Sequence, residues 1–143
     1  MSVLHRLRLF FVLLGSGFLI LGQSTFAVED SNPALLTMSS IGDAKIGRTI
    51  FDKECSKCHT TIQNQHKKGA SLYGIFGKKS GQIVGYEKTS QEMKEAAIIW
   101  NTKNLDLFIE RPSQLIKDQK MKYKGISDQK SRKDLIAYLA SIK

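Results

Sequence analysis

Two cysteines and a histidine stand together in the stretch Cys55-Ser-Lys-Cys-His59, and these are the only cysteines among 143 residues. Thiols and an imidazole at this spacing could form a disulfide, a thioredoxin-like redox pair, part of a zinc site or a covalent attachment point for haem. A bridge across two residues would constrain little of the unfolded chain, and no strand alternation of a βαβ unit flanks the pair. A zinc site needs about four ligands, and only His66 lies nearby. The pattern Cys-x-x-Cys-His therefore favours covalent haem.

Each residue of this motif has a physical role in holding haem. Two thiols about one helical turn apart can form thioethers with the two haem vinyl groups, and the adjacent imidazole of His59 then lies over the iron as an axial ligand. The group that fills the sixth position of the iron separates an electron carrier from a catalyst or a gas binder.

Met121 is the first candidate for that sixth position, because it lies between two predicted helices and far from His59 in the sequence. A methionine at an arbitrary position usually fills the core, and His66 is too close to His59 to reach the opposite face easily. The residues alone leave the role of Met121 open. The other methionines lie in the N-terminal segments or in a predicted helical piece: Met1, Met38 and Met93.

The N-terminus has the pattern of a secretory signal peptide, with a basic start, an apolar stretch over residues 9–21 and small residues before a cut after Ala27. The apolar stretch is shorter than the roughly 20 residues of a typical membrane span, although an uncleaved anchor is the alternative. We predict a signal peptide at 1–27, a flexible leader at 28–41, one folded domain at 42–143, and export to the periplasm. Cleavage would leave 116 residues, enough for one small core that a cofactor could complete.

The charge balance indicates an acidic partner. The chain has 22 basic and 13 acidic side chains, a net charge of +9. For an exported protein a nucleic acid is an improbable partner, so an acidic protein surface or an anionic membrane surface is favoured.

The elements that must position the motif are predicted to be helices joined by long loops. Asp43 can cap a helix that carries apolar residues toward Cys55 and Cys58, and a short helical piece is expected over residues 91–99. A third helix follows a cap at Asn101 or Thr102 and stops before Pro112, and a last helix follows a cap at Ser127. Five glycines and the absence of a hydrophobic periodicity predict a loop region over residues 60–85. Residues 113–125 are predicted to form a lysine-rich loop. The predicted fold class is all-α.

Several motifs follow one another along the chain: Gly47 and Phe51, the cysteine motif, residues 69–82, Gly85-Tyr86, Trp100, Pro112, Lys120-Met121, and residues 134–139. In these motifs and in their order, the chain from about Gly42 to Lys143 resembles the class I cytochromes c, of the mitochondrial-like, medium-length type that bacteria also have. The resemblance implies a small single domain whose terminal helices pack together, with Gly47 against Tyr138, and whose long loops wrap around one haem c. It also implies that His59 and Met121 are the axial ligands. Trp100 and Lys78 would lie at the haem propionates.

This sequence departs from the family pattern at several positions. Ala70 replaces a proline whose carbonyl accepts the histidine N–H, and Lys78 replaces an arginine. Phe108 stands where a tyrosine is common, and Tyr123 where a phenylalanine usually covers the haem edge. Lys117-Asp118-Gln119 replaces proline-glycine-threonine before the ligand methionine, so we hypothesise that the Met121 bond is labile and that Lys120 or Lys122 replaces it at high pH.

The expected function is that of a monomeric electron carrier, not an enzyme, shuttling single electrons between a quinol-oxidising membrane complex and a terminal oxidase or other acceptor. Its basic residues are expected to dock on acidic surfaces of these complexes, and peripheral membrane contact is a further expectation. Two alternatives are a haem peroxidase or gas sensor that uses a labile methionine, and a membrane-anchored electron-transfer subunit. The proposed docking residues are Lys53, Lys57, Lys67, Lys68, Lys78, Lys120, Lys122 and Lys124.

Overall fold

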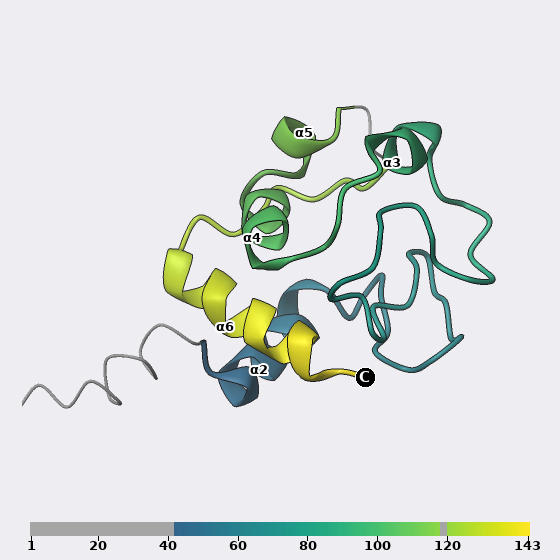
Figure 1. Cartoon of the computed structure of the whole chain (residues 1–143). Coiled ribbons are helices and arrows are strands. Elements are labelled where there is room, and N and C mark those ends of the chain that lie inside the picture. Colours follow the sequence, from purple (N-terminus) through teal and green to yellow (C-terminus); the bar gives the residue numbers. More distant parts are fainter. Residues whose placement is uncertain (1–41, 118–119) are drawn as a thin grey trace, which may run out of the picture. The chain divides into compact units, whose positions relative to one another are not determined.

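The structure of the chain is a computed structural model that describes residues 42–117 and 120–143. The helices of this part are α2 (Ala44–Glu54), α3 (Gln91–Ala96), α4 (Thr102–Glu110), α5 (Pro112–Leu115) and α6 (Gln129–Ser141) (Figure 1). Within these residues the β contact is one isolated bridge between Lys79 and Ile99. The all-α prediction is confirmed. The predicted signal peptide (1–27) and leader (28–41) lie outside the described residues. Within residues 42–117 and 120–143, no helix is long and apolar enough to cross a membrane.

Helix α2 begins where the sequence predicts. The Asp43 carboxylate accepts hydrogen bonds from the backbone N–H groups of Lys45 at 2.8 Å and Ile46 at 3.2 Å, so it satisfies donors that have no partner in the first helical turn. The helix ends at Glu54, and the Cys55 N–H still bonds to the Phe51 carbonyl at 2.8 Å. The cysteine motif therefore starts at the helix C-terminus, as expected.

The cap of the last helix differs from the prediction by one residue. The Asp128 side chain, and not that of Ser127, accepts the Ser131 N–H at 2.7 Å. The carbonyl of Ser127 instead accepts the Arg132 guanidinium at 2.7 Å. A carboxylate caps a helix as well as a serine hydroxyl does, so the sequence pattern alone could not choose between the two residues.

Two further boundaries differ from the prediction. Pro112 does not lead into a loop but begins the one-turn helix α5, since proline is tolerated at the first helical position. Helix α3 ends earlier than expected, because Ala97 adopts a left-handed conformation with φ of 50°. The chain then extends, so that Ile98 and Ser80 pair through their backbones and Trp100 pairs with Lys78.

The terminal helices α2 and α6 cross and pack on each other (Figure 1). Gly47 makes this crossing possible: a Cβ at this position would lie 1.9 Å from the Asp134 carbonyl oxygen and 2.8 Å from the Tyr138 Cβ. The buried Asp134 side chain accepts the Asp43 N–H at 2.7 Å and the Lys130 ammonium at 2.8 Å. The predicted pairing of the terminal helices is confirmed.

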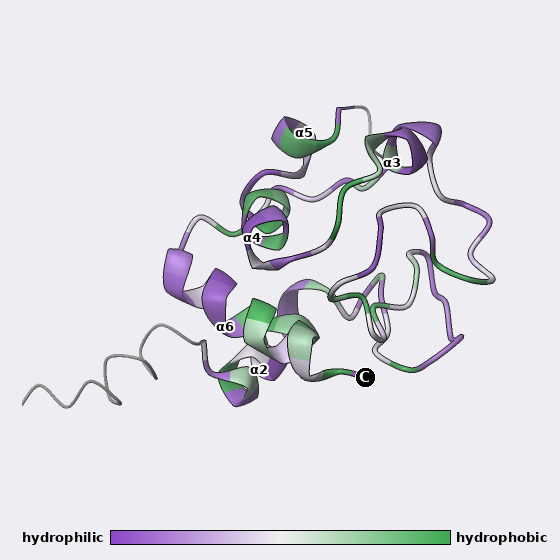
Figure 2. Ribbon diagram, in the orientation of Figure 1, coloured by the Kyte–Doolittle hydropathy of each residue, from purple (hydrophilic) through white to green (hydrophobic). Residues whose placement is uncertain are grey.

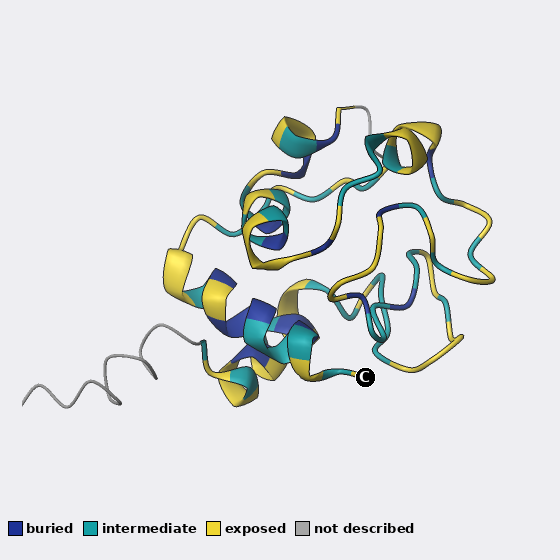
Figure 3. Ribbon diagram, viewed as in Figure 1, coloured by how far each residue is buried: buried dark blue, intermediate teal, exposed yellow. Residues whose placement is uncertain are grey.

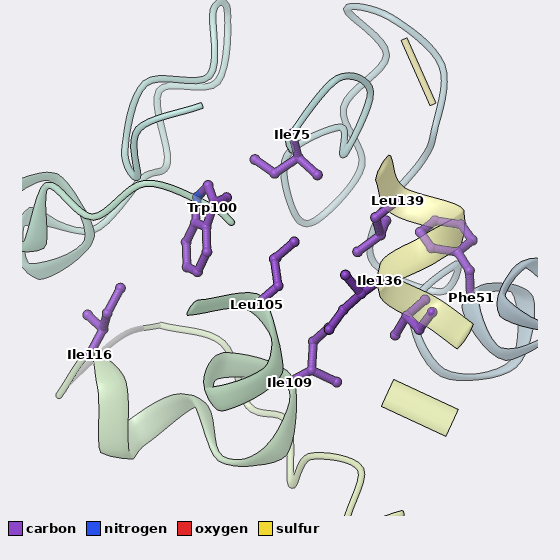
Figure 4. Packing of buried hydrophobic residues seen from close by; sticks show 9 residues of the cluster. Phe51, Ile75, Trp100, Leu105, Ile109, Ile116, Ile136 and Leu139 are labelled. Atoms are coloured by element: carbon purple, nitrogen blue, oxygen red, sulfur yellow. The ribbon is translucent and has the colours of Figure 1, made fainter. Parts of the chain in front are cut away.

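The core joins the helix pair to the loops. Figure 4 shows its side chains coming from α2, α4, α6 and the segments between them, and Figure 2 shows the apolar residues of α6 gathered in its second half. The burial pattern in Figure 3 agrees, since α6 begins with exposed residues at 129 and 130 and its buried residues follow from Arg132 onward. The buried apolar residues are Phe51, Ile75, Trp100, Leu105, Ile109, Ile116, Leu135, Ile136 and Leu139.

Candidate functional site

The cysteine motif forms a tight turn directly after α2. The Cys58 N–H and the His59 N–H both donate to the Cys55 carbonyl, at 3.0 and 2.9 Å. This turn holds both cysteines half-buried beside the histidine, and both are free thiols rather than a disulfide. Among the described residues there is also no group of three or more histidine, cysteine or acidic side chains that could hold a metal ion.

The environment of Cys55 keeps its thiol protonated. Burial and, to a smaller extent, the negative charge of Glu54 raise the pKa of Cys55 to about 12. Cys55 also packs against the hydrophobic core. The sulfur therefore lies at an apolar interior wall and not at a solvent-facing metal site.

One ring nitrogen of His59 is hydrogen-bonded to the backbone, and the other is available to bind a metal. Its Nδ1 lies 2.6 Å from the Ala70 carbonyl oxygen, and because a carbonyl can only accept, Nδ1 must carry the proton. Burial lowers the pKa of His59, while the Ala70 hydrogen bond opposes that shift. A neutral imidazole with Nε2 unprotonated is the form that ligates a metal, and a carbonyl on the other nitrogen is its usual support. The alanine carbonyl thus does what the proline carbonyl of the family pattern does.

Gly69 presses against the imidazole and should tolerate no side chain. A Cβ there would lie 2.4 Å from His59 Cε1. We expect Gly69→Ala to displace the ring and to weaken axial ligation, which would appear as loss of the low-spin optical spectrum of the holoprotein. Ala70→Gly, which keeps the carbonyl and adds no bulk, is the matched control. A normal spectrum for Gly69→Ala would contradict this placement of the ring.

Trp100 and Lys78, both predicted to lie at the haem propionates, are brought together by their backbones. The Trp100 N–H donates to the Lys78 carbonyl at 2.9 Å. The indole is 5% exposed and packs on Phe108 with ring centroids 4.9 Å apart. The Lys78 side chain is exposed and its Nζ lies 3.4 Å from the Tyr73 carbonyl. Their roles as propionate partners stay predictions.

Met121 lies half-buried in the extended segment that leads to α6. Residues 118 and 119, which the sequence singles out as a departure from the family turn, lie outside the described residues. The role of Met121 as the second axial ligand therefore stays a prediction. Its neighbours Lys120 and Lys122 are exposed.

His66 has a structural role. Its Nδ1 accepts the Ser71 N–H at 3.0 Å, so Nε2 carries the proton and donates to the Val84 carbonyl at 3.1 Å. The imidazole thereby joins two glycine-rich loops. Both nitrogens are used, in agreement with the expectation that His66 is not an iron ligand.

Sequence reasoning did not foresee the electrostatic influence of Glu54 and Cys55 on the Tyr123 phenol. Burial raises the pKa of Tyr123, and the charges of Cys55 and Glu54 add to that effect. Residues 54 and 123 are far apart in sequence, and no local pattern joins them. Only the departure from phenylalanine at position 123 marked the tyrosine.

The donor set of this site fits haem c. Two free thiols stand beside an imidazole whose Nδ1 is committed to a carbonyl, and the adjoining wall is apolar, with Cys55, Ile75 and Trp100 in one cluster. Covalent thioethers need the two sulfurs, and the iron needs the free Nε2. Each requirement is met by a residue of this site.

Comparison with known proteins agrees with this site. The family model described as Cytochrome c matches residues 44–143. The cytochrome c of Euglena viridis is 35% identical over 102 residues, covering 71% of this chain and 99% of the relative. The cytochrome c of Tetrahymena pyriformis is 43% identical over 103 residues, covering 71% and 90%, and the cytochrome c2 of Rhodopila globiformis is 38% identical over 102 residues, covering 71% and 95%. The chain therefore belongs to the cytochrome c family, as a haem-based electron carrier with haem c attached at Cys55 and Cys58.

Proposed function

We propose that this protein is a periplasmic carrier that moves single electrons between a quinol-oxidising membrane complex and a terminal oxidase or other acceptor. The observation that supports it best is the neutral His59 imidazole, fixed by the Ala70 carbonyl with Nε2 available. Bound haem supplies a one-electron couple at its iron.

The residues that would hold the haem iron are His59 and Met121. Two protein ligands would leave no coordination position for a substrate, and methionine ligation with burial would favour a high reduction potential. The Ala70 carbonyl and the close approach of Gly69 fix the imidazole ring, and the buried Trp100 indole packs on Phe108. This arrangement favours electron transfer over catalysis at the iron.

The docking surface is proposed to be basic. The eight lysines suggested by the sequence are all exposed. Lys67 is tied to the motif, since its Nζ donates to the Ser56 carbonyl at 2.6 Å, which fixes a positive charge beside the attachment turn. Lys53 lies 3.6 Å from the Glu54 carboxylate, so this pair is neutralised in part.

Export to the periplasm is part of the proposal and is supported by the signal-peptide pattern of residues 1–27. An exported location suits a chain whose haem is covalently retained. Membrane fractionation of the expressed full-length protein tests it, since recovery only in the membrane fraction would favour the anchored alternative.

Optical spectroscopy of the holoprotein tests the ligation. We expect the oxidised form to show the red sulfur-to-iron band of methionine ligation, and the reduced form not to bind carbon monoxide at neutral pH. Carbon monoxide binding at neutral pH would contradict a closed iron and favour the peroxidase or sensor alternative. Following the red band as the pH rises also tests the labile Met121 bond, because that hypothesis requires the band to disappear in alkaline solution.

Salt dependence tests the docking surface. We expect the second-order rate of electron transfer with an acidic redox partner to fall steeply between about 10 mM and about 300 mM salt, because exposed charges are screened over about 10 Å at 0.1 M. Lys67→Gln should reduce this slope more than Lys103→Gln, a change in an exposed lysine of α4. A flat profile would contradict electrostatic docking.

A further inference from the structure

The peptide unit that joins Ala70 to Ser71 lies between two histidines. Its carbonyl, which belongs to Ala70, accepts the His59 Nδ1–H at 2.6 Å. Its N–H, which belongs to Ser71, donates to His66 Nδ1 at 3.0 Å. The His66 ring extends the series, because its Nε2–H donates to the Val84 carbonyl at 3.1 Å. One line of hydrogen bonds therefore runs from the proposed axial ligand, through a single peptide plane, to the second histidine.

The backbone on both sides of this peptide unit is held by other bonds. The Gly69 N–H donates to the Cys58 carbonyl at 2.7 Å, and the Leu72 N–H donates to the Thr60 carbonyl at 2.8 Å. Ser71 is 3% exposed, so bulk water has little access to its N–H. Loss of the second imidazole would therefore leave the peptide unit in place but would take away the acceptor of its N–H.

The bond at the N–H end of the peptide unit affects the bond at its carbonyl end. Hydrogen bonds that share a chain polarise one another, which strengthens each by about 10 to 30%. With His66 as acceptor, the Ala70 carbonyl oxygen becomes more negative and accepts the His59 Nδ1–H more strongly. A stronger bond at Nδ1 raises the basicity of Nε2, the nitrogen available to the iron. A more basic ligand stabilises the oxidised iron, because this state carries one more positive charge.

We propose that His66 is a positioning residue that lowers the reduction potential of the holoprotein, because it polarises the peptide unit to which His59 is bonded. This inference rests on the proposed one-electron carrier. The two nitrogens of the His66 ring then have separate tasks. Nδ1 acts on the axial ligand through the peptide unit, and Nε2 joins the loop at Val84.

Two conservative variants separate these tasks. In His66→Asn the amide oxygen stands near the position of Nδ1, so it can accept the Ser71 N–H, but the bond to the Val84 carbonyl is lost. In His66→Gln the longer amide reaches the position of Nε2 and can donate to the Val84 carbonyl, but no acceptor remains for the Ser71 N–H. Neither variant changes the charge, because an imidazole that accepts at Nδ1 is neutral.

The first measurement is a redox titration of the purified holoprotein and its variants. We expect His66→Gln to raise the midpoint potential and His66→Asn to leave it at the wild-type value. A role in loop structure alone predicts the opposite sign, since a looser loop pair admits water, and water stabilises the more highly charged oxidised iron.

Tyr86→Phe is the matched control for loosening of the loops. The Tyr86 hydroxyl donates to the Lys68 carbonyl at 2.7 Å, so this variant removes another bond between the same two loops without changing a bond of the peptide unit. We expect it to lower the unfolding temperature without raising the midpoint potential.

Proton NMR of the reduced holoprotein gives a second readout that does not depend on electron transfer. We expect the His59 Nδ1–H resonance to move upfield in His66→Gln and to keep its wild-type position in His66→Asn and Tyr86→Phe. An unchanged or lower potential in His66→Gln overturns the proposal, as does an equal rise in both His66 variants or an Nδ1–H resonance that does not move. A wild type without a reversible one-electron wave would instead contradict the carrier function, so the two failures can be told apart.

Discussion

Replacing Cys55 and Cys58 together by alanine is expected to give a chain with no covalently attached haem. The two thiols are free and lie in one turn beside His59, and no other cysteine exists in the sequence. Loss of both sulfurs removes every thioether and leaves haem, if it binds, dependent on the axial ligands alone. The measurement is haem staining after denaturing electrophoresis, with the pyridine haemochrome spectrum of the soluble fraction.

Two single variants and one control test each attachment cysteine separately. Cys55→Ala and Cys58→Ala should each retain one thioether, which shifts the haemochrome band of the remaining covalent product. Ser56→Ala lies in the same turn and loses only a side-chain bond to the Asp52 carbonyl, so it should stain normally. Covalent haem in the double variant would contradict the attachment site.

Gly47→Val is expected to destabilise the domain by about 3 kcal/mol or more. The new Cβ would overlap the Asp134 carbonyl oxygen, at 1.9 Å, and backbone cannot swing away as a flexible side chain can. Helices α2 and α6 would have to separate, which exposes Phe51 and Leu135 from the core. Denaturant unfolding of the holoprotein, followed by circular dichroism, measures the loss.

Thr49→Val serves as the comparison, because it places the same β-branched side chain on α2 at an exposed position. Its effect should stay within about 0.5 kcal/mol. If Gly47→Val cost no more than Thr49→Val, the close crossing of the terminal helices would be wrong.

Much of the helical content could be predicted because its causes are local. Asp43 and Asn101 cap helices where a carboxylate or an amide meets free N–H groups, and apolar spacing marks the buried faces of α4 and α6. The one-residue difference at the cap of α6 accompanies contacts of Arg132 that a cap pattern does not report. Its guanidinium donates to the nearby Ser127 carbonyl and to the distant Asp106 carboxylate.

The functional site also has one part that could be predicted from local sequence and one part that could not. The attachment motif is continuous in sequence, so its chemistry could be named from the spacing, and the resemblance supplied the carbonyl at position 70 that His59 uses. The influence of the Glu54 and Cys55 charges on the pKa of Tyr123 depends on how α2 and the segment before α6 meet. The second ligand, Met121, stays a prediction because its place opposite His59 depends on the same long-range arrangement.

The hydrogen bond from the Asp43 N–H to Asp134 joins residues 91 positions apart. The contact therefore ties the residue before α2 to the middle of α6, and it closes almost the whole described chain into one loop. Because a ribosome makes α2 long before α6, the turn with Cys55 and Cys58 is complete in the nascent chain before the helix that packs on α2 exists.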